Sequence, residues 1–300
     1  MQLAHAGRKG STKKPWKGQG ALSPEEGPWE PVAPSALPFS SDYPMPRELS
    51  KEGIRRVVDA FGQAARRVLE AGFQVLEIHS AHGYLIHEFL SPLSNKRMDE
   101  YGGSFENRTR LAREIVSSIR RQWPERFPLF IRISATDWKE GGWDVEQSVE
   151  LVKQLAPLGV DLVDCSSGGL AADAKIALGP GYQVPFSERI RSETGVRTAA
   201  VGLIETKEQV EEILAKGQAD LVLMARGFLR DPYWPLRTAR ELGHKISWPA
   251  QYLRAAPPDT PARQPLPIAD IRQEDLPPKR ESTPISARTS ESPRAKAPAK

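Results

Sequence analysis

The stretch EIHSAHGYLIHEFLSPLSNKRMDEYGGSFENRTR, residues 77–110, begins in an apolar run that indicates a β-strand ending near Ile78. His79, His82 and Tyr84 follow within six residues, where that strand must end. Two imidazoles and a phenol so close together can hold a carbonyl oxygen and supply a proton. The sequence therefore predicts a cluster of hydrogen-bond donors at the end of this strand.

Two other interpretations of the histidines stay open at this point. His79 and His82 could bind a metal ion with His87 as a third ligand, or they could be a structural pair in the core. A turn after a strand rarely gives the i, i+4 geometry of helical metal pairs, and no cysteine or well-placed carboxylate completes the coordination. We therefore prefer the donor pair to both alternatives.

Composition restricts the class of protein. Of the 300 residues, 39% are hydrophobic and 27% charged, as in a soluble globular protein. No apolar stretch approaches the ~20 residues that a bilayer requires, and residues 1–10 lack the apolar core of a secretory signal. The single cysteine, Cys165, excludes an internal disulfide and is most simply a core residue. The net charge of +4 comes from scattered basic residues without a binding motif. We expect a cytoplasmic protein with no membrane or nucleic-acid partner.

Residues 50–248 alternate strand and helix patterns. A helical stripe runs from Ile54 to Leu69 and can end at Gly72. Further helices are expected around Leu111, Ile115 and Ile119, after capping boxes at Asp144/Gln147 and Thr206/Gln209, over 185–194 and from about Pro232. Strands are expected at 2–5, 75–78, 129–133, 161–165, 196–201 and 219–224. Strict alternation indicates a parallel sheet of six strands covered by helices.

Two proline-rich segments interrupt this pattern. Residues 10–49 hold eight prolines between Pro15 and Pro46, which predicts an irregular excursion without regular ladders. Residues 255–300 hold ten prolines and few large apolar groups, which predicts a disordered tail. The folded unit is therefore expected over 1–254.

Polar residues and glycines recur where the predicted strands end, as in the active-site rim of a parallel barrel. They are His5, His79, His82, Tyr84, Arg132, Ser166, Gly202 and Arg226. Gly202 and the Ala225-Arg226-Gly227 stretch can approach a phosphate, although Arg226 could instead form a surface ion pair. Arg132 within an apolar strand needs an anion, and an internal salt bridge to Glu77 is the alternative.

Four motifs resemble the old yellow enzyme family of FMN-dependent ene-reductases, in its shorter thermophilic-type branch. They are QLAHAGRK at 2–9, IHSAHGYLIHEFLSPLSN at 78–95 with its NRTR continuation, the VGLI and ARGFLRDPYWP pair, and WPAQYLRA at 248–255. The resemblance covers about 1–254. It implies a TIM (β/α)8-type barrel and an NAD(P)H oxidoreductase that reduces the C=C bond of an enone or enal with NADPH or NADH. A homo-oligomer is a possible assembly.

The resemblance also implies roles for FMN-binding residues. Gln2 would bind the pyrimidine edge of the flavin, and Arg132 would lie beneath the ring system. Gly202, Ala225 and Arg226 would contact the phosphate. The family usually has glycine where Ala225 stands, which adds only a methyl group at a backbone contact.

The substrate site follows from the same resemblance. His79 and His82 would grip the substrate oxygen, and Tyr84 would donate the proton. Arg254 would reach into the site of a neighbouring subunit. The aromatic residue usual after that arginine is replaced here by Ala255-Ala256.

The front of the chain departs from the family. The QLAHAGR motif belongs to the third strand in the family but starts here at residue 2. We therefore expect a barrel that lacks about two βα units, with two open edges that favour aggregation. A truncated gene model, an alternative start or a degenerate relic would explain this. The alternative to an active enzyme is an inactive barrel, a pseudoenzyme or fragment, that binds little or no FMN.

Overall fold

The computed structural model describes residues 1–261, so most of the predicted 255–300 tail lies outside the described residues. The main sheet consists of β1 (Gln2–Leu3), β4 (Leu76–Ser80), β5 (Leu129–Ser134), β6 (Leu162–Ser166), β7 (Arg197–Val201) and β8 (Leu221–Leu223). The helices are α1 (Lys51–Glu70), α2 (Leu85–Leu90), α3 (Phe105–Arg120), α4 (Val145–Leu155), α5 (Val184–Thr194), α6 (Lys207–Ala215), α7 (Arg226–Arg230) and α8 (Trp234–Glu241).

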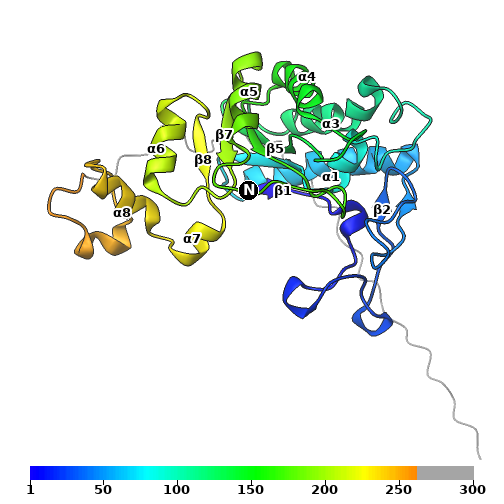
Figure 1. Cartoon of the computed structure of the whole chain (residues 1–300), viewed down its shortest axis with the longest axis horizontal. Helices are drawn as coiled ribbons and strands as arrows, with labels where there is room; N and C mark the ends of the chain where they lie inside the picture. Colours follow the sequence, from blue (N-terminus) through cyan, green and yellow to red (C-terminus); the bar gives the residue numbers. More distant parts are fainter. Residues whose placement is uncertain (262–300) are drawn as a thin grey trace, which may run out of the picture.

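The strands of the main sheet follow one another in chain order, β1-β4-β5-β6-β7-β8, and every neighbouring pair is parallel. This confirms the predicted six parallel strands. Helices α3, α4 and α5 lie along one side of the sheet, as Figure 1 shows. The arrangement is that of a (β/α) barrel wall, with β1 and β8 as its two edges.

Apolar stripes place the helices against the sheet. Ser50 caps α1 by accepting a hydrogen bond from the N–H of Gly53, and the stripe beginning at Ile54 is buried. Gly72, at φ +85°, follows the end of the helix as predicted. Along β4, Leu76 and Ile78 are fully buried, so the residues between them face the opposite side of the sheet.

One expectation about local structure was wrong in part. Gln147 does not complete a capping box with Asp144, because its side chain accepts from Arg108 Nη2 at 2.8 Å and donates to a backbone oxygen. The Thr206/Gln209 box forms as predicted. The helix expected from about Pro232 forms as α8, which begins at Trp234, and the short helix α7 before it was not predicted.

The excursion over 10–49 is tied to the body of the molecule. It contains a two-residue parallel ladder between β2 (Val32–Ala33) and β3 (Arg47–Glu48), contrary to the expectation of no ladder. Arg97 holds it by donating to the carbonyl oxygens of Pro34 at 3.1 Å and Leu49 at 2.6 Å. Proline has no backbone N–H to donate, so few backbone hydrogen bonds hold this segment. The buried guanidinium of Arg97 supplies hydrogen bonds in their place. Within residues 1–261, no helix is both long and apolar enough to cross a membrane.

Candidate active site

The structure brings His79, His82 and Tyr84 together at the carboxyl end of β4. The ring centroids of His79 and His82 are 5.1 Å apart, and those of His79 and Tyr84 are 4.9 Å apart. His79 belongs to the strand, His82 follows it, and Tyr84 immediately precedes α2. The cluster predicted from the sequence therefore exists, while the roles of its members stay a prediction.

A tight turn fixes the second imidazole. His82 has φ +58° and Gly83 has φ +68°, both in the left-handed region. The backbone N–H of His82 donates to Ser134 Oγ at 2.9 Å. A Cβ at Gly83 would lie 2.3 Å from the carbonyl oxygen of Gly169, so only glycine fits there. Contacts with Ser134 on β5 and Gly169 after β6 therefore fix the position of this turn.

The two imidazoles are neutral at pH 7. Burial, and after it the positive charge of Arg132, lowers the pKa of His79 to about 4 and that of His82 to about 3. His82 Nε2 lies 2.7 Å from Ser166 Oγ, and its Nδ1 lies 3.4 Å from His79 Nε2. Each neutral ring carries one N–H donor, which suits hydrogen bonding to an oxygen better than proton transfer.

Lys9 is a site residue that the sequence reasoning missed. Its ammonium donates to the carbonyl oxygens of His82, at 2.9 Å, and of Gly169. It also lies 4.0 Å from the ring centroid of Phe39. Burial lowers the pKa of Lys9 to about 8, and Arg8 adds to this. Its place in the QLAHAGRK motif, just after the first strand, was the available signal. Ser134 and Gln183 were missed as well.

The ring of His87 is engaged by contacts within the protein. Its Nε2 lies 2.9 Å from Asp137 Oδ1, and its Nδ1 accepts the N–H of Gly83 at 2.9 Å. Both ring nitrogens are thus engaged, and the side chain is fully buried. Among residues 1–261, no group of three potential ligands could hold a metal ion. His87 instead holds the turn that carries His82.

Arg132 forms an internal salt bridge to a strand carboxylate, which was the alternative to an anion, and the carboxylate is Asp164, not Glu77. Its Nε lies 3.1 Å from Oδ2 of Asp164 on the adjacent strand β6. Burial raises the pKa of Asp164 to about 7, Arg132 opposes this, and a hydrogen bond with Glu77 raises it further. Glu77 Oε2 also accepts from Gln2 Nε2 at 2.7 Å. These four side chains line a cavity of about 450 Å³ on the sheet face opposite the buried Leu76 and Ile78.

A second, smaller cavity adjoins the first. Gly202, Ala225 and Arg226 line about 90 Å³ at the ends of β7 and β8, as the phosphate prediction requires. Gly202 has φ +124°, a conformation that favours glycine. Both cavities share residues 201 and 223–225. Arg226 has no ion-pair partner within the described residues, so the surface-pair alternative finds no support there.

Arg254 is not brought to this site. It lies in the 3-10 helix η5 (Ala250–Ala255) and is exposed. The segment after α8 projects from the end of the molecule that carries β8, as Figure 1 shows. Tyr233, just before α8, donates from Oη to Tyr252 Oη in η5 at 2.8 Å. A role in a neighbouring subunit stays a prediction.

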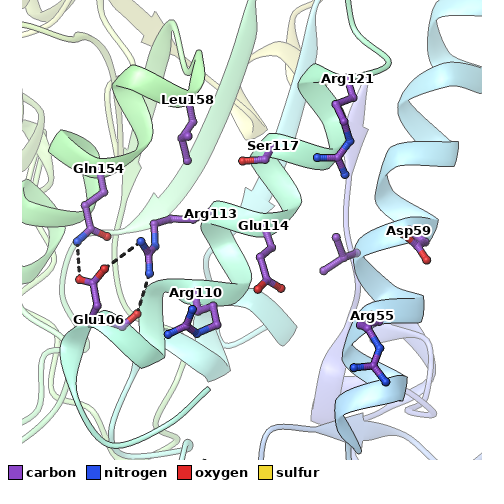
Figure 2. A pocket seen from close by; sticks show the side chains of 11 residues that line it. Arg55, Asp59, Glu106, Arg110, Arg113, Glu114, Ser117, Arg121, Gln154 and Leu158 are labelled. Atoms are coloured by element: carbon purple, nitrogen blue, oxygen red, sulfur yellow. Dashed lines mark hydrogen bonds and ion pairs between the residues drawn. The ribbon is translucent and has the colours of Figure 1, made fainter. Parts of the chain in front are cut away.

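A cavity larger than these two lies elsewhere, among the helices. It measures about 610 Å³ and is lined by side chains of α1, α3 and α4. Figure 2 shows Arg113 directed at Glu106, to which it is ion-paired at 2.9 Å, while Gln154 donates to the same carboxylate. The cavity is lined by both arginines and carboxylates, and none of its lining residues lies at the end of a strand. Size alone therefore does not identify the reactive site.

Residues 1–245 match the model of the NADH:flavin oxidoreductase / NADH oxidase family. The chain belongs to this family. It is 51% identical over 254 residues to the NADPH dehydrogenase of Geobacillus thermodenitrificans (strain NG80-2), covering 85% of this chain and 69% of that protein. It is 49% identical to the NADPH dehydrogenase of Bacillus licheniformis, covering 85% of this chain and 70% of that protein.

Solved structures of family relatives share the fold. The old yellow enzyme homologue from Zymomonas mobilis superposes with a TM-score of 0.59 and 28% identity, over 71% of this chain and 62% of that one. Morphinone reductase in complex with tetrahydroNAD gives a TM-score of 0.62 and 26% identity, over 81% and 65%. The chain thus spans less than two thirds of these solved relatives, and its fold is a TIM-barrel type of which it forms six strands.

The residues present fit the FMN of this flavin oxidoreductase family. The larger cavity offers the amide of Gln2 and the guanidinium of Arg132, two groups that can donate to the polar edge of a flavin ring. The smaller cavity offers Gly202, Ala225 and Arg226 for a phosphate. A polar ring edge and an anionic end connected by a shared wall match a flavin mononucleotide.

Proposed function

We propose that this chain forms the catalytic part of an FMN-dependent NAD(P)H oxidoreductase that reduces the C=C bond of α,β-unsaturated carbonyl compounds. The observation that carries the proposal is the pair of neutral imidazoles, with a phenol beside them, at the strand end next to the cation Arg132. When bound, FMN supplies hydride taken from NAD(P)H to the β-carbon of the substrate.

The histidines bind and polarise the carbonyl group. When the substrate binds, the N–H of His79 turns from His82 to the carbonyl oxygen, and the N–H of His82 donates to the same oxygen. Both stabilise the negative charge that develops on it. A donor of this kind, fixed in place before reaction, lowers the barrier by about 3 kcal/mol. The turn at Gly83 and the contact of His82 with Ser134 provide that fixation.

Tyr84 holds the proton for the α-carbon. It immediately precedes α2, and its ring is tilted against His79 with centroids 4.9 Å apart. This places the phenol beside the imidazoles that hold the oxygen. A proton delivered from there reaches the face of the substrate that the histidines leave open.

Tyr84→Phe tests the assignment. NADPH should reduce the flavin of the variant as fast as that of the unmodified chain, while turnover of cyclohex-2-enone should fall by roughly 10²-fold or more. Tyr101→Phe is the matched control, because that phenol donates to Glu114 on α3 and lies away from the cluster. Equal enone turnover in Tyr84→Phe and the unmodified protein would remove Tyr84 from this role.

A second candidate is an inactive barrel that binds little FMN. It is favoured by the engagement of both predicted ring contacts, since the Gln2 amide bonds Glu77 and Arg132 pairs with Asp164. Quenching of flavin fluorescence on titration with the full chain separates the two candidates. Stoichiometric quenching supports the oxidoreductase, and free-flavin fluorescence at every ratio supports the inactive barrel.

A further inference from the structure

Hydrogen bonds around the histidine cluster determine where each imidazole proton lies. The backbone N–H of Ala81 donates to His79 Nδ1 at 3.2 Å, so that nitrogen carries no proton. The single proton of neutral His79 is therefore on Nε2. This N–H faces His82 Nδ1 at 3.4 Å, which must accept it.

The same reasoning places the proton of His82. Because its Nδ1 accepts, its one proton lies on Nε2, and this N–H donates to Ser166 Oγ at 2.7 Å. Ser166 then cannot direct its own hydrogen at the imidazole. His82 is consequently unable to act as a base toward Ser166, which excludes a serine–histidine nucleophile at this site.

The hydroxyl of Ser166 donates to Gln183 Oε1 at 3.3 Å. Ser167 donates to the same oxygen at 2.5 Å. The amide of Gln183 is oriented by its own N–H, which donates to the carbonyl oxygen of Val201 at 2.8 Å. Gln183 is 2% exposed, so it has no water to exchange with. These hydrogen bonds form a continuous chain from His82, in the turn after β4, through Ser166 and Gln183 to Val201 on β7.

We propose that Gln183 is a positioning residue that, through Ser166, keeps the proton of His82 on Nε2 and ready for a substrate oxygen. The inference rests on the proposed function and deepens it. On binding, the carbonyl oxygen takes the place of Ser166 Oγ as acceptor. Without Gln183, the Ser166 hydroxyl turns its hydrogen toward His82 Nε2 and competes for that position.

Ring-nitrogen NMR of the full chain tests this without any cofactor. In protein labelled with 15N-histidine, protonated and bare ring nitrogens of neutral imidazole have distinct shifts, and His82→Gln assigns the signals. We expect His82 to carry its proton on Nε2 alone. Gln183→Met, of similar length, should mix the two tautomers. Ser167→Ala should keep the single tautomer, because Ser167 contacts Gln183 but not His82.

A restoring variant separates positioning from simple packing. Gln183→Glu keeps an acceptor for the Ser166 hydroxyl and should keep the single tautomer, whereas a mixed signal there would contradict the proposal. Adding Ser166→Ala to Gln183→Met removes the competing hydroxyl and should return His82 to Nε2–H. If Gln183→Met does not fold, the His82 tautomers of the unmodified chain and of Gln183→Glu still test the proposal. A proton on Nδ1 in either protein would contradict it.

Kinetics distinguish failure of this inference from failure of the proposed function. In flavin-loaded protein, Gln183→Met should lower kcat for cyclohex-2-enone about tenfold, less than the roughly 10²–10³-fold loss when a donor is removed outright, with flavin reduction by NADPH unchanged. A proton on Nδ1 in the unmodified chain, or an unchanged tautomer in Gln183→Met, overturns the role of Gln183. If the tautomers are as expected but the flavin-loaded protein does not turn over the enone, the proposed function fails and the role of Gln183 stands.

Discussion

Glu88 makes the stability of the fold depend on pH. The side chain lies in α2 with no exposed surface, and its carboxyl accepts the N–H of Arg8 at 2.9 Å. Burial raises the pKa of Glu88 from 4.5 to about 8, against the opposing charges of Arg8 and Lys9. The folded chain therefore holds a proton that the unfolded chain releases between pH 4.5 and 8. The free energy of unfolding must fall as pH rises through this window and level off above it.

The magnitude follows from the two pKa values, which differ by about 3.5. Across the whole window the difference amounts to about 5 kcal/mol, a large part of the stability of an ordinary domain. Glu88→Gln keeps an oxygen that can accept from Arg8 but does not titrate. The variant should match the unmodified protein at pH 5 and exceed its free energy of unfolding by up to about 5 kcal/mol at pH 9.

Urea unfolding at several pH values from 5 to 9, followed by tryptophan fluorescence, measures this. Glu150→Gln is the control, because Glu150 is exposed on α4 and pairs only with Lys153. The control should keep the pH dependence of the unmodified chain. If Glu88→Gln also kept it, the buried carboxyl would not be the group that titrates, and the reasoning from burial would fail.

Three further changes test other parts of the structure. Gly83→Ala should destabilise the fold by about 2–4 kcal/mol in thermal melts, because the new Cβ would meet Gly169 O at 2.3 Å in a left-handed conformation; a variant of unchanged Tm would contradict this. Asp164→Asn should flatten the loss of stability, about 4 kcal/mol, that the raised pKa of about 7 causes between pH 4 and 7; an equal pH slope would argue against it. Ile115→Ala, at a fully buried position on α3, should cost about 2–5 kcal/mol in urea, and a cost under 1 kcal/mol would show a looser core.

Helices and strands were predictable where neighbours in sequence determine them. The Ile54–Leu69 stripe and the Thr206/Gln209 capping box depend on residues within a few turns of each other, and both form. The Asp144/Gln147 box failed because Arg108, distant in sequence, competes for the Gln147 side chain. A prediction from local sequence fails where a residue distant in sequence offers the side chain a better hydrogen bond.

The candidate site was likewise predictable only where its residues are close in sequence. His79, His82 and Tyr84 lie close in sequence, so their meeting required only one turn. The sequence did not identify Asp164 as the partner of Arg132, because strand order and not spacing along the chain places the two side by side. The links from His82 to Ser166 and onward cross three strands, and the periodicity of one segment carries no information about them.

The pairing of β1 with β4 has a consequence for synthesis on the ribosome. The amide of Gln2 finds Glu77 only after 75 further residues have been made. At translation rates of about 5–20 residues per second, this delay lasts roughly 4–15 s. During that interval the QLAHAGRK segment has emerged without β4, the strand with which β1 pairs. A slow codon run between these positions would prolong its contact with chaperones, and synonymous recoding there should alter yield without altering one amino acid.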